Sequence, residues 1–232
     1  MRLLRHALAL VAFVFASPLA AQTSPVVVEL YTSQGCSSCP PADALMHELA
    51  ARDDVLALAL HVDYWDYIGW KDPFADPAHA ARQRAYATAG ERRMIYTPEM
   101  VVGGVTDIVG TKPMALSKAI AEHASQPAAV GLDLRRDGNV LHIDAQALTA
   151  ATEEMTVHLM RYMPKQTTQI KRGENRGKTL DYANIVQGWT VLGSWDGRTP
   201  LSLTRAIEGD DPVVVLIQNG DVGRIVAAAR VR

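Results

Sequence analysis

The chain contains two cysteines, Cys36 and Cys39, in the stretch GCSSCPP. Such a C-x-x-C pair can exchange disulfides, hold a metal ion or form a small structural bridge. Between a strand and a helix, the first cysteine lies at the helix N-terminus, where unpaired amides and the helix dipole favour a thiolate. That thiolate can attack a disulfide, and the second cysteine can then resolve the mixed disulfide. The pattern predicts Cys36 as the attacking residue and Cys39 as the resolving residue, with no bound cofactor.

Other interpretations of the pair differ in their chemical support. A structural zinc site needs four ligands, usually from two cysteine pairs, and the chain has no second pair. A disulfide that closes so short a loop restricts the unfolded chain little and therefore stabilises little. Copper remains open, because two thiolates and one imidazole can hold a soft metal ion and His61 is a candidate third ligand. The alternatives to exchange are thus a copper-binding chaperone using Cys36, Cys39 and His61, or a non-catalytic interaction module.

The elements around the pair are predicted from hydrophobic pattern and turn residues. Residues 26–31, VVVELY, form a short apolar, β-branched run typical of a buried strand. After Pro40 and Pro41, which suit the first turn of a helix, apolar residues recur at helical spacing up to Ala51. A second apolar run, residues 55–62, predicts a parallel neighbour of the first strand. The cysteines therefore lie in the loop of a strand-helix-strand unit.

The remainder of the first half extends this unit. An aromatic segment follows the second strand, and a helix is expected from Ala78 to Ala89. The stretch IYTPEMVVGGVTDIVG predicts a hairpin that turns at Gly103 and Gly104. Pro113 opens a last helix that runs to about Ala124.

The texture changes after Gln126 to period-two alternation with frequent turn signals, which predicts an antiparallel β-sandwich. The fold class expected is α/β, with one domain at residues 22–126 and a β-sandwich-like domain at residues 127–232. Within the second domain, the polar loop KRGENRGK, residues 171–178, is expected to be a solvated turn; contact with the first domain or a partner is the alternative.

The first 21 residues resemble a cleavable signal peptide, with Arg2 and Arg5, an apolar run from Ala7 to Ala16 and small residues up to Ala21. The apolar run is shorter than the about 20 residues that span a bilayer, so no membrane span is expected after processing. A periplasmic or secreted protein meets an oxidising environment, where the cysteines would be joined unless something reduces them. The formal net charge of −2 points to no nucleic-acid partner.

The order of predicted elements from Val26 to about Ala124 resembles the thioredoxin fold. The stretches VVVELYTSQGCSSCPPAD, HVDYWDYIGWKDPF, RQRAY and YTPEMVV are similar to a family of exported bacterial thioredoxin-like proteins catalogued as a domain of unknown function. The resemblance implies that Cys36 and Cys39 are the redox pair. It also implies that Pro98 forms the cis bond of that superfamily, so that Thr97 offers its main chain to an extended peptide.

Further roles rest on position. Glu29, on the first strand, lies near where thioredoxins carry a buried acid that shuttles a proton to the resolving cysteine; a strand-end glutamate facing water is the alternative. Tyr64, Trp65 and Trp70 follow the carboxyl end of the second strand and could line a substrate groove or pack an insertion. The expected partners are thiol- or disulfide-containing proteins or small molecules and a redox partner in the cell envelope. The motif leaves the direction of electron flow open.

Overall fold

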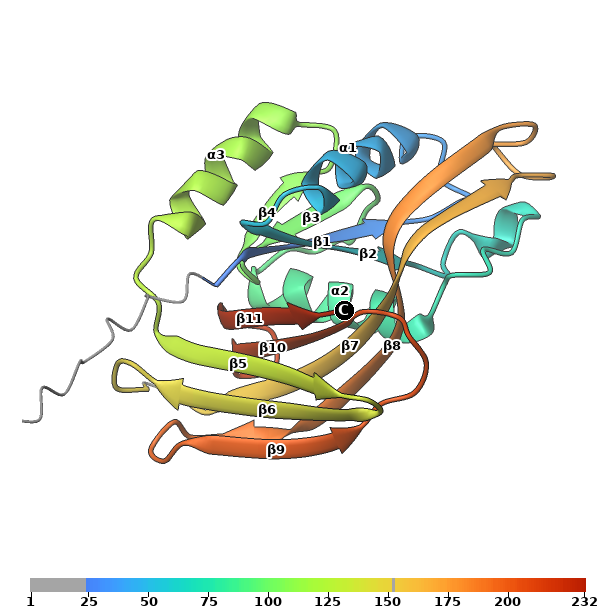
Figure 1. Ribbon diagram of the computed structural model, residues 1–232. Helices are drawn as coiled ribbons and strands as arrows, with labels where there is room; N and C mark the ends of the chain where they lie inside the picture. The colour runs from blue at the N-terminus through green and yellow to red at the C-terminus, as the bar shows by residue number, and fades with distance from the viewer. Residues whose placement is uncertain (1–23, 152) are drawn as a thin grey trace, which may run out of the picture.

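A computed structural model describes residues 24–151 and 153–232, so the predicted signal peptide lies outside the described residues (Figure 1). The helices are α1 (Pro40–Ala50), α2 (Pro77–Ala89) and α3 (Pro113–Ala124), with a short 3-10 helix η1 (Asp66–Ile68). The strands are β1 (Val26–Thr32), β2 (Val55–His61), β3 (Glu99–Val102), β4 (Thr106–Val109), β5 (Val130–Asp137), β6 (Val140–Ala147), β7 (Met155–Gln169), β8 (Thr179–Trp195), β9 (Leu201–Ala206), β10 (Val213–Asn219) and β11 (Ile225–Val231). No helix in these ranges is long and apolar enough to cross a membrane.

Proline marks the start of each α-helix, at Pro40, Pro77 and Pro113. The first helical residue needs no amide donor, and the fixed φ of proline suits this position. At α2 the Asp76 side chain adds a cap by accepting a hydrogen bond from the Ala78 amide at 2.8 Å. These local signals explain why the helices start close to where the sequence predicts them.

A single eight-stranded sheet runs through both halves of the chain, in the order β11-β10-β7-β8-β2-β1-β3-β4. β1 and β2 are parallel, as predicted, and β3 and β4 form the predicted hairpin. The two halves join where β2 meets β8 in a short parallel contact, Ala59 opposite Ile185. Beside it, the Asn184 side-chain amide donates to the Ala57 carbonyl at 2.9 Å. The sheet therefore continues across the predicted boundary at Gln126.

Both faces of β1 are covered, because α1 and α3 pack on one face and α2 on the other (Figure 1). Alternate β1 residues point to opposite faces. Val28 and Leu30 belong to the core with α1, whereas Val27 and Tyr31 belong to the core with α2. This alternation decides which β1 side chains can approach the cysteines.

The second half contributes a sandwich of two sheets. The three-stranded sheet β5-β6-β9 packs on β7, β10 and β11 of the large sheet around a separate apolar core. Leu141 and Ile143 of the small sheet and Val215 of the large sheet are fully buried in that core. The fold is therefore α/β, with a thioredoxin-like central sheet and a small antiparallel sheet, which confirms the predicted fold class.

β7 and β8 are longer than their neighbours and extend past the edge of the sandwich. Their ladder runs from Met155 opposite Trp195 to Gln169 opposite Thr179, while β10 pairs with β7 only up to Arg161. We call residues 163–185 the arm and residues 170–178 its tip. The arm projects beyond the sandwich beside α1, where Figure 1 shows its two strands in gold and orange.

Candidate redox site

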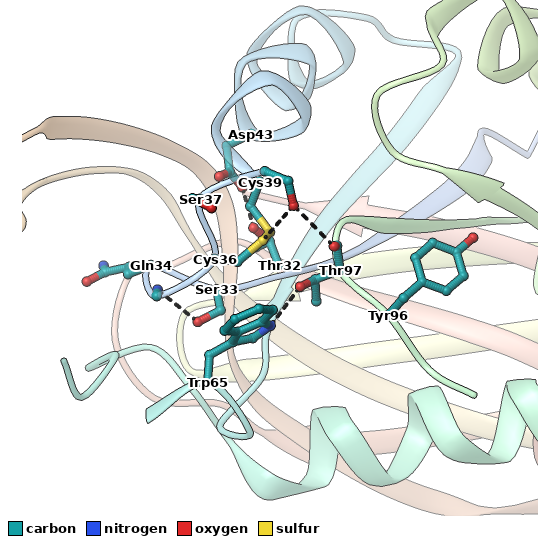
Figure 2. Close-up of a disulfide and its surroundings, with 12 residues drawn as sticks. Thr32, Ser33, Gln34, Cys36, Ser37, Cys39, Asp43, Trp65, Tyr96 and Thr97 are labelled. Carbon is teal, nitrogen blue, oxygen red and sulfur yellow. Dashed lines mark hydrogen bonds between the residues drawn. A yellow bond between two sulfur atoms is a disulfide. The ribbon is translucent and has the colours of Figure 1, made fainter. Parts of the chain in front are cut away.

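Cys36 and Cys39 form a disulfide in the turn that joins β1 to α1 (Figure 2). The turn is closed by hydrogen bonds from the Cys36 amide to the Ser33 carbonyl, 3.1 Å, and from the Cys39 amide to the Cys36 carbonyl, 3.3 Å. Cys39 is the N-cap of α1, so Cys36 lies just before the helix. Both cysteines are 0% exposed, whereas Ser37 and Ser38 between them are exposed.

Thr97 and Pro98 lie on the opposite side of the disulfide. Their peptide bond is cis, as the resemblance implies. The Ser38 hydroxyl lies 3.3 Å from Cys36 Sγ and 3.5 Å from the Thr97 carbonyl oxygen to which it donates. The Trp65 indole donates to Thr97 Oγ1 at 2.8 Å. The disulfide is therefore enclosed between the cysteine turn, Trp65 and Thr97 (Figure 2).

A buried carboxyl group that is not evident from the sequence, Asp43, lies one helical turn after Cys39. Its amide donates to the Cys39 carbonyl at 3.1 Å, so the two residues share one face of α1. One carboxyl oxygen, Oδ1, accepts a hydrogen bond from Thr32 Oγ1 at 2.8 Å, while the other, Oδ2, is buried without a partner. Burial raises the pKa of Asp43 to about 7. Asp43 can therefore exchange a proton near neutral pH.

Glu29 lies on the other face of β1, with α2 rather than with α1. Its carboxylate accepts hydrogen bonds from Arg82 Nε at 2.7 Å and from the Tyr86 hydroxyl at 2.6 Å. Arg82 also donates to the Gln218 side chain at 2.9 Å, which links α2 to β10. Glu29 is therefore fully buried in an ion pair rather than exposed at a strand end. Its predicted role as proton shuttle stays a prediction, and this geometry favours Asp43 instead.

His61 ends β2 in a buried pair with Asp72. Its Nδ1 lies 2.7 Å from Asp72 Oδ2, and both side chains are 0% exposed. Asp72 also accepts from the amides of Gln34, 2.8 Å, and Phe74, 2.9 Å. Burial alone would raise the pKa of Asp72, but His61 and these donors hold it below its ordinary value. The pair thus fixes the start of the cysteine turn through Gln34.

In this disulfide form, Cys36, Cys39 and His61 do not make up a set of copper ligands. One imidazole nitrogen of His61 is engaged with Asp72, and the two sulfurs are bonded to each other. Within residues 24–151 and 153–232, no group of three or more His, Cys, Asp or Glu side chains is placed to hold a metal ion.

The three aromatic residues predicted to bind substrate each make an internal hydrogen bond. Tyr64 donates to Gln83 of α2 at 3.0 Å, and Trp70 donates to the Gln34 side chain at 2.8 Å. Trp65 contacts Thr97 as described and is the one among them next to the disulfide. All three are half-buried, so they pack the insertion onto the site. A role in substrate binding stays a prediction for each.

The arm brings the second half of the chain to the cysteine turn. Asn175 at its tip is 0% exposed, and its side-chain amide donates to the carbonyls of Gln34, 3.0 Å, and Cys36, 2.8 Å. The Glu174 carboxylate accepts from the Ser37 amide at 3.2 Å. The expectation of a solvated turn at residues 171–178 is therefore wrong for Asn175, because this side chain satisfies two carbonyls of the turn.

A pocket of about 320 Å³ opens between α1 and the arm. Asp43 and His47 line it from α1, and Lys165 and Asp181 line it from the arm. Asp43 is 5% exposed, so little of its surface faces the pocket. The pocket therefore lies directly beside the residue that carries the unpaired carboxyl oxygen.

Comparisons with known proteins give similarity over most of the chain. The crystal structure of protein AGR_C_4864 from Agrobacterium tumefaciens is 29% identical, with a TM-score of 0.78, over 91% of this chain and 96% of that chain. HBP35 of Porphyromonas gingivalis is 13% identical, with a TM-score of 0.64, over 90% of this chain and 75% of that chain, which shows a shared fold alone. No curated protein matches. A family model described as "Protein of unknown function (DUF1223)" matches residues 27–218, and the chain belongs to this family.

Proposed function

We propose that this protein is an exported thiol–disulfide oxidoreductase that acts through Cys36 and Cys39. The observation that carries the proposal is the disulfide directly before α1 with an unpaired, buried carboxyl group one turn after it. A structural bridge needs no such proton acceptor, whereas thiol–disulfide exchange moves protons together with electrons. The support is thus chemical rather than based on fold alone.

The exchange proceeds in two steps that balance. In the reduced protein, the Cys36 thiolate attacks a substrate disulfide, forms a mixed disulfide and releases one substrate thiolate. Cys39 then attacks Cys36 Sγ, which releases the second substrate thiolate and forms the Cys36–Cys39 bond. Two electrons pass from the protein to the substrate, and the two protons of the dithiol go to the released thiolates through solvent and Asp43. The reverse sequence oxidises a substrate dithiol.

Asp43 is the group that serves Cys39 in this scheme. A thiol of ordinary pKa is a poor nucleophile at neutral pH, so the resolving cysteine needs a base. Asp43 shares the helix face of Cys39, and its pKa of about 7 lets it hold or release a proton there. In this scheme the proton leaves to water through the pocket that Asp43 helps to line.

A substrate must displace part of the protein before it reaches Cys36, because no surface of this residue is exposed. The exposed residues of the motif are Ser37 and Ser38, and Ser38 lies between Cys36 Sγ and the Thr97 carbonyl. Displacement of Ser38 would free both the sulfur and that carbonyl for a substrate chain. The protein would then select substrates that can open this turn.

Trapping of mixed disulfides tests the proposal. Cys39→Ser leaves the attacking residue but removes the resolving one, so substrates should stay attached to Cys36 in envelope extracts. The matched control is the Cys36→Ser, Cys39→Ser double variant, which should capture nothing by this bond. If Cys39→Ser captures no partner while a known exchanger captured in parallel does, the exchange function is rejected.

One observation favours a second function, a non-catalytic interaction module with a permanent disulfide. Both cysteines are completely buried in the oxidised form, which protects a bond from reduction. The reduction potential separates the two functions. A value well below about −300 mV fits a permanent bond, whereas a higher value fits an exchanging pair.

Export is part of the proposal and rests on the pattern of residues 1–21. An oxidising compartment is where a disulfide of this kind persists. Cell fractionation tests this part, since the protein should be found in the periplasm or medium with Met1 through Ala21 removed. A full-length protein in the cytosol would contradict it.

A further inference from the structure

The tip of the arm is a built contact with the redox turn. Asn175 donates to two carbonyls of the turn, and its own Oδ1 accepts from Lys178 Nζ at 2.8 Å. The cysteine turn also donates to the arm, since the Gln34 side-chain amide donates to Thr168 Oγ1 at 3.2 Å. Glycine at position 173 lets the tip pack closely against Trp70, since the Cβ of any other residue there would lie only 3.3 Å from the Trp70 side chain. These contacts hold the tip in one position over the turn.

Glu174 places a carboxylate against the backbone of Ser37, the residue after Cys36. Its Oε2 accepts from the amide of Ser37, the residue that directly follows the attacking cysteine. Amides at this end of α1 are the donors that would stabilise a thiolate on Cys36. The carboxylate occupies one of them and adds a negative charge at the residue next to Cys36. Both effects disfavour the thiolate and leave the uncharged disulfide unaffected.

We propose that Glu174, held in place by Asn175, shifts the Cys36–Cys39 pair toward its disulfide form. The proposal rests on the exchange function above. It assigns Glu174 as a positioning residue that sets the reduction potential of the Cys36–Cys39 pair. Through this contact the second half of the chain makes the pair a weaker oxidant and a stronger reductant.

Other charged groups also face the turn, and the Glu174→Gln variant described below leaves them unchanged. Lys178 approaches from the tip, Asp72 from the segment after β2, and Asp43 from α1. Glu174 is exposed, unlike Asp43 and Asp72, so salt should screen its effect strongly. Screening therefore separates a charge effect of Glu174 from a change in structure.

The test measures the equilibrium of the purified protein with glutathione. Two glutathione thiols give two electrons and two protons to the Cys36–Cys39 disulfide and become one glutathione disulfide. Glu174→Gln keeps an oxygen that can accept from Ser37 but removes the charge. We expect an equilibrium constant for reduction about threefold larger, or about 14 mV in potential, together with a lower pKa of Cys36. The control is Glu208→Gln, an exposed charge on the loop between β9 and β10.

Salt and a second variant sharpen the result. The difference between wild type and Glu174→Gln should shrink as salt rises to about 1 M, where the screening length is about 3 Å. Asn175→Ala should give at least the same shift, because it releases the tip. Adding Glu174→Gln to Asn175→Ala should then change little, since the two act through one contact.

Three results would overturn the inference: an unchanged equilibrium constant in Glu174→Gln, a difference that salt does not reduce, or fully additive shifts in the double variant. The glutathione equilibrium does not depend on a physiological substrate. If trapping fails but Glu174→Gln shifts the equilibrium, the exchange function falls and the role of Glu174 stands. If trapping succeeds and the equilibrium is unchanged, only the role of Glu174 falls.

Discussion

Two buried carboxyl groups flank β1, one on each face, and they differ in their partners. Glu29 lies with α2, where a guanidinium and a tyrosine hydroxyl meet its carboxylate. Asp43 reaches the other face from α1, where a single hydroxyl, that of Thr32, meets one of its oxygens. Both side chains are nearly or completely buried. The difference therefore lies in partners and not in exposure.

A buried carboxyl group can stabilise the fold or take part in proton transfer, depending on its partners. A buried charge that is paired and hydrogen bonded holds its neighbours in fixed positions, and losing one partner is costly. A buried carboxyl group without a counter-charge keeps its proton until the pH is near neutral. Glu29 thus ties α2 to β1, and Arg82 extends the contact to β10, whereas Asp43 is suited to proton transfer beside the cysteines. Four predictions test this division.

The largest expected effect is on the paired side. Arg82→Met leaves Glu29 buried without its counter-charge and should lower the free energy of unfolding by about 3 to 5 kcal/mol, measured by urea denaturation. The control is Arg52→Ala, which breaks the exposed pair with Asp54 and should cost less than about 1 kcal/mol. Equal losses for the two variants would contradict the structural role of the Glu29–Arg82 pair.

The second prediction concerns stability against pH on the unpaired side. Burial raises the pKa of Asp43 from 3.8 to about 7, so between these pH values the folded protein holds a proton that the unfolded chain has lost. This contribution is present below about pH 4 and is lost as the pH rises through 7, by on the order of 4 kcal/mol. Asp43→Asn should remove that loss and be more stable than wild type at pH 8. Parallel stability curves from pH 4 to 8 for wild type and variant would refute it.

The third prediction separates the two acids by reaction rate. Asp43→Asn should slow the resolving step by about 100-fold at pH 7 and abolish its pH dependence near 7, measured in single turnovers with a model disulfide. Glu29→Gln should leave the pH dependence unchanged in whatever protein remains folded. A pH profile that changes with Glu29 and not with Asp43 would reverse the assignment and restore the role predicted from the sequence.

The smallest expected effect comes from the hydroxyl group that meets Asp43. Thr32→Val removes the donor that lowers the pKa of Asp43, so this pKa should rise above 7 by less than about one pH unit. The shift can be followed by NMR titration of the carboxyl carbon. A pKa that falls in Thr32→Val would show that another group sets the proton affinity of Asp43.

Much of the fold was accessible from local sequence. Prolines at the helix starts, apolar runs in β1 and β2 and the glycines at the β3–β4 turn act over a few residues, and the structure contains each expected element. The cysteine pair also followed from a short motif, whereas the cis bond at Pro98 was implied by the family resemblance. Signals of this kind are strong because the physical cause lies next to its effect in the chain.

The missed features depend on contacts between distant residues. Asp43 resembles an ordinary acid in the first turn of a helix, and only its burial against Thr32 distinguishes it. Asn175 lies in a polar loop whose glycines predict a solvated turn, yet it docks 139 residues away on Cys36. The single parallel contact between β2 and β8 likewise has no local signature. The only sequence feature that pointed to Asp43 was its position four residues after Cys39, which places the two residues on the same side of a helix.

The distance along the chain between Ser37 and Glu174, 137 residues, also bears on how the protein forms. Contacts between distant residues require closure of a long loop, which slows folding. Cys36 and Cys39 need only their own turn to meet, so their disulfide can form before the arm docks. A newly made chain would therefore pass through a period in which its cysteines react without the restraint that the finished protein places on them.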